Sequence, residues 1–210
     1  MIKKSTSKKI ISTLTQHYHI FPPLRFTDLY QLCVAVVLSA QTTDRQVNMV
    51  TPVLFEKYPD FESLAKAHVQ DVEQLIKPTG FYHNKAKHII EMAQTILTRY
   101  NGNVPNTRED LMKLPGVGRK SANVILAMGF GIPAMPVDTH VARVAFRIGY
   151  SDSKKPAAIE EALMNSIPQK DWVSAHLLFI FHGRAVCSAR NPKCSTCPVI
   201  SYCCFANKNL

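Results

Sequence analysis

Residues 114–122 read Leu-Pro-Gly-Val-Gly-Arg-Lys-Ser-Ala, a glycine-containing turn that leads into a helix. The turn contains Gly116, Val117 and Gly118, and the two glycines have no side chain. Their backbone can therefore come close to a sugar-phosphate chain, while N–H groups at the start of the helix supply partial positive charge. This combination predicts a site that grips a phosphate group through the backbone.

Arg119 and Lys120 follow the turn and fall on the first turn of the predicted helix. A lysine amine is a nucleophile only after it has lost its proton, and the pKa of an exposed lysine is about 10.4. The helix macrodipole and the charge of Arg119 both disfavour a cation here, which favours the neutral amine. Lys120 is therefore a candidate nucleophile. The alternative is a lysine that only binds phosphate or faces solvent.

Cysteines are concentrated near the end of the chain in the pattern C-x6-C-x2-C-x5-C, which places four thiols within 17 residues. These are Cys187, Cys194, Cys197 and Cys203, and Cys204 follows directly. Thiolates are soft ligands that suit zinc or an iron–sulfur cluster, and the spacing alone leaves both metals open. A redox centre or a group of buried cysteines are the other interpretations.

Positive charge dominates the chain, with 25 Lys and Arg against 15 Asp and Glu and a formal net charge of +10. Residues 1–27, 111–137 and 172–210 contain no acidic residue at all. The loop between the first two cysteines of the pattern carries Arg190 and Lys193, so a structural metal would order a basic surface. We expect these segments to face a polyanion such as nucleic acid.

The chain of 210 residues has enough hydrophobic residues, 46%, to build a core without many disulfides. Its longest apolar run, residues 32–40 with one serine, is too short to cross a bilayer. The opening Met-Ile-Lys-Lys-Ser lacks the apolar core of a signal peptide. We therefore expect a cytosolic protein with reduced thiols and no membrane partner.

Helical periodicity runs through most of the chain, and no convincing pattern of alternating strands is present. Apolar stripes at residues 29–37 and 86–100 predict two helices that pack on a core. Thr107 and Asp138 are typical residues for the start of a helix. We predict an all-α protein of about ten helices, which include residues 107–114, 118–130, 138–148, 156–167 and 172–186.

The glycine-containing turn, the sequence Val-Asp-Thr-His-Val at residues 137–141 and the cysteine pattern occur in this order. Two further segments precede them: Leu-Ser-Ala-Gln-Thr-Thr-Asp at residues 38–44 and Gly-Phe-Tyr-His-Asn-Lys-Ala at residues 80–86. With these five motifs in register over nearly its whole length, the chain resembles endonuclease III, a family of bacterial DNA repair glycosylases within the helix-hairpin-helix superfamily.

The resemblance implies a two-lobed, all-α helix-hairpin-helix DNA glycosylase fold with a C-terminal iron–sulfur cluster loop. A six-helix lobe would span residues 22–132 and contain the helix-hairpin-helix at about 107–130. The second lobe would combine residues 1–21 with residues 133–210. It would carry a [4Fe–4S] cluster within residues 187–203, and DNA with an extruded base would lie between the lobes.

The resemblance also implies roles for single residues. Lys120 matches the nucleophile of the family, and Asp138 matches its catalytic aspartate, with an ordinary helix cap as the alternative role. Gln41 and Phe81 match residues that fill the gap left by an extruded nucleotide, although the family often has leucine where Phe81 stands. Without the resemblance they would be a surface glutamine and a core phenylalanine. His140 would position Asp138 or contact phosphate, with a structural histidine as the alternative.

The remaining residues implied by the resemblance are cluster ligands and DNA contacts. The family spacing makes Cys203 rather than Cys204 the fourth ligand. The implied ligands are Cys187, Cys194, Cys197 and Cys203. The implied DNA contacts are Gly116, Val117, Gly118, Arg119, Arg190 and Lys193, with His83 and Lys85 as further candidates for contact with the DNA backbone.

These expectations combine into a bifunctional DNA N-glycosylase and abasic-site lyase of base excision repair. Its substrates would be oxidised or damaged pyrimidines and abasic sites in double-stranded DNA, and it would act as a monomer in the bacterial cytosol. Two alternatives stay open. A monofunctional mismatch glycosylase would use water in place of Lys120, and a non-enzymatic DNA-binding protein would keep the hairpin and the cluster without chemistry.

Overall fold

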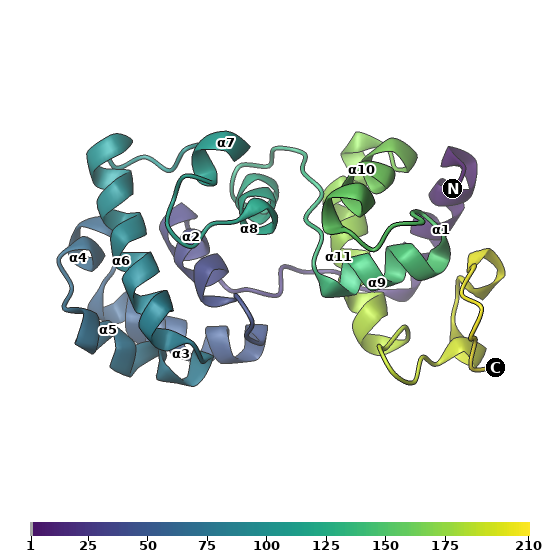
Figure 1. Ribbon diagram of the computed structural model, residues 1–210, viewed down its shortest axis with the longest axis horizontal. Coiled ribbons are helices and arrows are strands. Elements are labelled where there is room, and N and C mark those ends of the chain that lie inside the picture. Colours follow the sequence, from purple (N-terminus) through teal and green to yellow (C-terminus); the bar gives the residue numbers. More distant parts are fainter. Residues whose placement is uncertain (1) are drawn as a thin grey trace. The chain divides into compact units, whose positions relative to one another are not determined.

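The computed structural model describes residues 2–210, and the regular structure in this part of the chain is helical throughout (Figure 1). The prediction of an all-α protein is therefore confirmed. None of the helices in residues 2–210 has the length and apolar character needed to cross a membrane. The α-helices are α1 (Lys4–His17), α2 (Leu29–Leu38), α3 (Asp44–Lys57), α4 (Phe61–Ala65), α5 (Val69–Ile76), α6 (Tyr82–Arg99), α7 (Arg108–Leu111), α8 (Arg119–Val124), α9 (Thr139–Ile148), α10 (Pro156–Ser166) and α11 (Trp172–Ala185).

The chain divides into two compact units. One unit is the continuous segment Pro22–Ile132, which contains α2 to α8. The other combines the described residues up to Phe21 with Pro133–Leu210, so it contains α1, α9 to α11 and the cysteine-rich end. This second unit is thus assembled from both ends of the chain.

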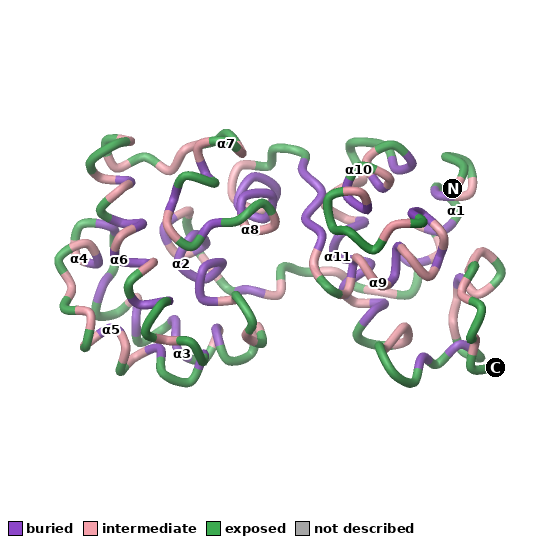
Figure 2. The backbone as a smooth tube through the Cα atoms, viewed as in Figure 1, coloured by how far each residue is buried: buried purple, intermediate pink, exposed green. Residues whose placement is uncertain are grey.

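Helix α2 forms the centre of the continuous unit. It begins where Asp28 Oδ1 accepts a hydrogen bond of 2.8 Å from the N–H of Gln31. Every residue from Leu32 to Leu38 is buried, as Figure 2 shows for this helix, and α2 contacts α3, α6 and α8. The prediction of a single apolar stripe was wrong here, because a helix that is apolar on all sides is placed in the interior rather than on the surface.

The predicted helix over residues 118–130 is shorter and less regular than expected. Helix α8 covers Arg119–Val124 and continues into a π-helical turn at Ile125–Gly129. Gly129 packs closely on α2, since a Cβ atom there would lie 2.5 Å from Leu29 Cδ2. The preceding helix α7 starts at the predicted cap, where Asp110 N donates to Thr107 Oγ1 at 3.2 Å, but it ends at Leu111 instead of residue 114.

The unit that carries the cysteines has its own core, in which α1 and α9 both pack on α11 and α10 packs on α9. Ile10 and Leu14 of α1 are fully buried there with Val144 and Phe179. A buried hydrogen bond of 2.9 Å joins Ser7 Oγ to the hydroxyl of Tyr150. These contacts fasten the N-terminal helix to a part of the chain more than a hundred residues away.

Candidate functional site

The turn between α7 and α8 needs glycine at position 116 for reasons of packing. Gly116 has a φ of 77°, in the region that favours glycine. A Cβ atom at this position would lie 2.9 Å from Val37 Cγ1 and 3.1 Å from His88 Cβ. Gly116 therefore lets the turn sit directly against α2 and α6, and Val117 beside it is buried.

Gly118 has a different environment, although it lies only two residues further on. It is the N-cap of α8, its φ of −92° is open to any residue, and a Cβ atom there would meet nothing within 4 Å. The exposed side of the turn is thus clear of side chains where α8 begins. Arg119 is exposed and Lys120 is half-buried on the first turn of that helix.

This difference between the two glycines can be tested by placing serine at each. Gly116→Ser is expected to lower the free energy of unfolding by about 1–3 kcal/mol, because it combines a left-handed backbone with an overpacked site. Gly118→Ser should change stability little, since serine is a good N-cap, but should weaken binding to duplex DNA by filling the open side. Urea denaturation and DNA titration measure the two effects. Equal losses of stability in both variants would contradict the assignment.

Gln41 and Phe81 share an unusual backbone conformation. Gln41 has a φ of 51° and Phe81 a φ of 49°, and both residues are exposed. Phe81 is 67% exposed, which excludes the interpretation of this residue as a core phenylalanine. Strained, left-handed backbone at residues other than glycine is typical of functional positions. Both side chains are therefore available to a partner.

The two further candidates for backbone contact, His83 and Lys85, have other roles in the structure. His83 Nδ1 lies 2.8 Å from Glu73 Oε1, so it is held on its own unit by an ion pair when protonated. Lys85 is only 4% exposed. The expectation that Lys85 contacts the DNA backbone was wrong, because its side chain points into the protein and bonds to Thr42 and Thr79.

Asp138 is half-buried at the start of α9 and acts as its N-cap. Its Oδ1 accepts a hydrogen bond of 2.8 Å from the N–H of Val141. Two residues on, His140 Nδ1 lies 3.1 Å from Arg143 Nη2. Because a guanidinium group only donates hydrogen bonds, His140 accepts at Nδ1 and carries its proton at Nε2. The first turn of α9 is thus held in one orientation from two sides.

Arg143 also connects α9 with the end of α11. Its Nε donates to the carbonyl of Cys187 at 2.9 Å, and its Nη2 donates to the carbonyl of Gly183 at 2.9 Å. The packing here is close, since a Cβ atom on Gly183 would lie 3.1 Å from His140 Cβ. The orientation of His140 is therefore coupled to the position of the first cysteine in the cluster pattern.

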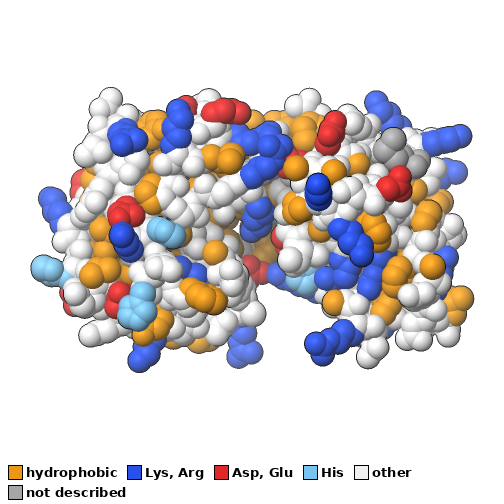
Figure 3. Space-filling model, viewed as in Figure 1, with side chains coloured by type: hydrophobic (Ala, Val, Ile, Leu, Met, Phe, Trp, Pro, Cys, Tyr) orange, Lys and Arg blue, Asp and Glu red, His pale blue; other side chains and the backbone are white. Residues whose placement is uncertain are grey.

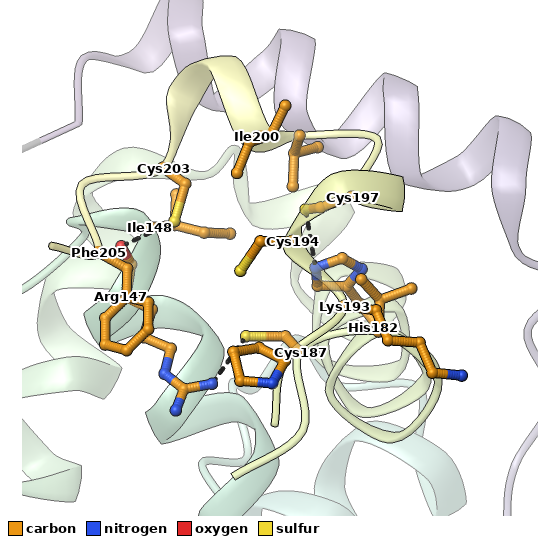
Figure 4. A pocket seen from close by; sticks show the side chains of 13 residues that line it. Arg147, Ile148, His182, Cys187, Lys193, Cys194, Cys197, Ile200, Cys203 and Phe205 are labelled. Carbon is orange, nitrogen blue, oxygen red and sulfur yellow. Dashed lines mark hydrogen bonds between the residues drawn. The ribbon is translucent and has the colours of Figure 1, made fainter. Parts of the chain in front are cut away.

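Four cysteines line one pocket, and their sulfur atoms face a shared space between the C-terminal loop, α9 and α11 (Figure 4). All of them are free thiols. Cys204 is exposed and does not line this pocket, and its N–H instead donates to the carbonyl of Arg147 at 3.1 Å. The lining cysteines are Cys187, Cys194, Cys197 and Cys203.

The donor chemistry of these thiols fits an iron–sulfur cluster. Four free cysteines line one pocket, and thiolates are the ligands that hold [4Fe–4S] clusters. Burial raises the pKa of the Cys197 and Cys203 thiols, so metal binding must displace their protons.

Arg147 and His182 also approach sulfur atoms of this pocket, and the sequence analysis missed both. Arg147 Nη1 lies 3.4 Å from Cys187 Sγ and donates to the carbonyl of Ser188 at 2.6 Å. His182 Nε2 lies 3.7 Å from Cys197 Sγ, and burial lowers the pKa of His182 to about 4. A signal for Arg147 was present, because it follows Arg143 by four residues and so shares its helix face.

The basic residues of the cysteine-rich loop are exposed. Arg190 and Lys193 face solvent, while the backbone N–H of Lys193 donates to the carbonyl of Val186 at 2.9 Å. Lys and Arg side chains also gather over α9 on the face drawn in Figure 3. Arg143 and Lys154 line a shallow pocket in this region. The loop therefore carries exposed cations, and backbone hydrogen bonds hold the loop in place.

Comparisons with known proteins match both the segment that contains the hairpin and the cysteine-rich end of the chain. Residues 34–169 match the HhH-GPD superfamily of base excision DNA repair proteins, and residues 187–203 match the iron–sulfur binding domain of endonuclease III. The chain is 49% identical to an endonuclease III of Synechocystis sp., covering 82% of this chain and 80% of the relative. An endonuclease III of Buchnera aphidicola is 41% identical and covers 100% of this chain and 99% of its own length.

The solved structures include one described as a trapped endonuclease III–DNA covalent intermediate. It shares 40% sequence identity with this chain and superposes with a TM-score of 0.92, over 97% of this chain and 96% of its own. The similarity in fold thus extends through the hairpin, α9 and the cysteine-rich loop.

Proposed function

Because the chain belongs to the HhH-GPD superfamily of base excision DNA repair proteins, and within it to the endonuclease III family, we propose that it releases damaged pyrimidines from double-stranded DNA and then cuts the strand. The observation that carries this proposal is Lys120 on the first turn of α8, beside an open turn that can hold a phosphate. The covalent complex with DNA formed by a relative supports the same chemistry. The chain is a DNA glycosylase with abasic-site lyase activity.

In the proposed reaction, the unprotonated amine of Lys120 attacks C1′ of the deoxyribose while the bond to the base breaks. The base leaves with the electron pair of that bond and takes up a proton. The amine then loses its proton and the sugar ring opens, which gives an imine. Removal of a proton from C2′ expels the phosphate on the 3′ side by β-elimination, so one nucleophile serves both base release and strand cutting.

Asp138 is proposed as the carboxylate that stabilises the positive charge on the sugar as the base departs. The hydrogen bond from Val141 to Oδ1 fixes the orientation of this carboxylate. The role as helix cap and the role in catalysis are therefore compatible. His140, held by Arg143, would keep the first turn of α9 in place or contact a DNA phosphate through Nε2.

Gln41 and Phe81 are proposed to fill the gap that an extruded nucleotide leaves in the duplex. Extrusion costs a few kcal/mol, and the cost is smallest for a pair that damage has already weakened. An exposed aromatic ring offsets the lost stacking between neighbouring bases. Phosphate contacts would come from Gly116, Val117, Gly118 and Arg119, through the turn and the start of α8.

The chain holds a [4Fe–4S] cluster, and we propose the four cysteines of the lined pocket as its ligands. When bound, the cluster supplies structure, because it ties the loop at both ends. Cys187, Cys194, Cys197 and Cys203 would then hold Arg190 and Lys193 on an ordered loop toward DNA phosphates.

The two loop cations give a measurable salt dependence. Each of Arg190→Ala and Lys193→Ala is expected to lower the slope of log affinity against log salt by about one, because one phosphate contact fewer releases one counterion fewer. The measurement is a titration of duplex DNA at several salt concentrations. Lys170→Ala, on the same unit but outside the loop, is the control. An unchanged slope in both loop variants would remove these residues from the interface.

The proposed partner is duplex DNA with damaged bases or abasic sites, bound by one copy of the chain in the bacterial cytosol. The test is base release from a panel of oligonucleotides that each carry one defined lesion, run beside borohydride reduction of a mixture with abasic DNA. Release together with covalent capture supports the proposal. Release without capture would point to the monofunctional alternative, and neither would point to a DNA-binding protein without chemistry.

A further inference from the structure

Two of the three non-glycine residues with left-handed backbone in the continuous unit, Gln41 and Phe81, lie in the loops before α3 and α6, and the third, Asn101, follows α6. The loop between α2 and α3 contains Gln41, and the segment between α5 and α6 ends with Phe81. Residues other than glycine keep this conformation only where the surroundings hold it. Contacts within the unit must therefore hold these two loops in place.

The structure shows a polar connection between the loops, centred on Lys85 of α6. Lys85 Nζ donates to Thr42 Oγ1 at 2.7 Å and to the carbonyl of Thr79 at 2.9 Å. The hydroxyl of Thr42 in turn donates to the same Thr79 carbonyl, which closes a triangle of hydrogen bonds. Thr42 is adjacent to Gln41, and Thr79 lies two residues before Phe81.

A buried lysine at this position would be energetically unfavourable if its only role were packing. Its side chain is buried, and desolvation lowers the pKa of Lys85 to about 8. The partners of its ammonium group are a hydroxyl and a carbonyl, which accept two hydrogen bonds without neutralising its charge. An apolar residue of similar length would fill the same volume with no charge to desolvate. The distinct property of lysine here is that one group can bond to both loops.

We propose that Lys85 is a positioning residue, which fixes the spacing of the two loops so that Gln41 and Phe81 enter the duplex together. This inference rests on the proposed function for the roles of Gln41 and Phe81. It does not place Lys85 in contact with DNA or with the reacting sugar. Gln46 Nε2, on the first turn of α3, donates to the carbonyl of Pro78 at 3.0 Å and adds a more exposed contact with the segment before Phe81.

Two variants remove the connection from opposite ends. Lys85→Met removes both hydrogen bonds of the ammonium group and keeps the length of the side chain. Thr42→Val removes the hydroxyl and keeps the shape of threonine, so it replaces the first variant if Lys85→Met does not fold. The control is Lys87→Met on the same helix, because Lys87 is exposed and its ammonium group lies 3.8 Å from Glu91 Oε1 of α6.

Hydrogen–deuterium exchange tests the connection without any DNA. In both variants the amides of residues 39–43 and 77–81 are expected to exchange about tenfold faster, since local opening requires less free energy once the loops separate. The amides of α2 should stay as slow as in the unchanged protein and in Lys87→Met. If only one loop, or neither, gains exchange, Lys85 does not couple them and the inference is overturned.

Extrusion of a nucleotide tests the consequence for function. With 2-aminopurine beside an abasic site, the fluorescence rise that reports extrusion should be about tenfold slower in Lys85→Met, whereas a flexible single-stranded abasic substrate should be cut at the normal rate. Adding Phe81→Ala to Lys85→Met should slow extrusion only a little further, because the effects of residues that act as one unit are not additive. Unchanged extrusion, or independent losses, would overturn the inference. Failure of the unchanged protein to cut abasic DNA would overturn the proposed function instead, and the exchange experiment would still decide the role of Lys85.

Discussion

Replacing Lys120 with glutamine is expected to abolish strand cutting and borohydride capture and to lower base release by at least about 10³-fold. Glutamine keeps the length and polarity of the side chain but has no amine that can form an imine. The turn and the N-terminus of α8 are unchanged in this variant, so binding to undamaged duplex DNA should stay within a factor of about three. The measurements are gel separation of cut and captured oligonucleotide and an equilibrium titration.

Lys113→Gln is the matched control for this experiment. Lys113 lies at the other side of the same hairpin, is exposed and pairs with Asp110 at 2.8 Å. It should retain capture and cutting, because its loss removes one surface charge and no nucleophile. Mass spectrometry of the captured adduct must place the crosslink on Lys120. A crosslink on another side chain, or normal cutting by Lys120→Gln, would disprove the assignment of the nucleophile.

Replacing Cys203 with serine is expected to have the second large effect. It acts on the binding of the cluster and not on the reaction with DNA. Cys203 lines the pocket with the other three cysteines, whereas its neighbour Cys204 is exposed outside it. Cys203→Ser should therefore lose the absorption at about 400 nm and most of the four irons of the cluster. The binding energy of a structural metal centre contributes to folding, so the melting temperature should fall as well.

Cys204→Ser is the control, at an adjacent position and with the same change of atom. It should keep the colour, the iron content and the melting temperature of the unchanged protein, because no ligand is removed. Iron analysis, visible absorption and thermal unfolding can be measured on one preparation of each variant. The reverse result, with loss of iron in Cys204→Ser alone, would assign the fourth ligand to Cys204 and require the loop to rearrange.

Local features of this protein could be predicted from its sequence. The starts of two helices at Thr107 and Asp138 follow from side chains that accept a hydrogen bond from an N–H three residues on. The all-α fold follows from helical periodicity, and the close approach at Gly116 follows from the absence of a side chain. In each case the decisive partners lie within a few residues, or the residue type itself limits the backbone.

Features that depend on distant parts of the chain could not be predicted in this way. Lysine is a residue type typical of protein surfaces. Lys85 is nevertheless buried, and Thr42, to which it bonds, lies 43 residues away in the sequence. Arg147 bonds to a loop 41 residues further on, and α2 is surrounded by helices that its own sequence does not specify. Phe81 was the opposite case, because an aromatic residue is typical of a core and this one is 67% exposed.

The assembly of one unit from both ends of the chain has a consequence for synthesis on the ribosome. The continuous segment Pro22–Ile132 has all its helices as soon as that stretch has emerged, so it can fold while translation continues. The nascent helix α1 must wait, because Ile10 and Leu14 share a core with residues of α11, which are made more than 150 residues later. Its apolar face stays open to chaperones until then, and the cysteines that line the pocket emerge after α11. Incorporation of iron therefore follows the folding of the continuous unit.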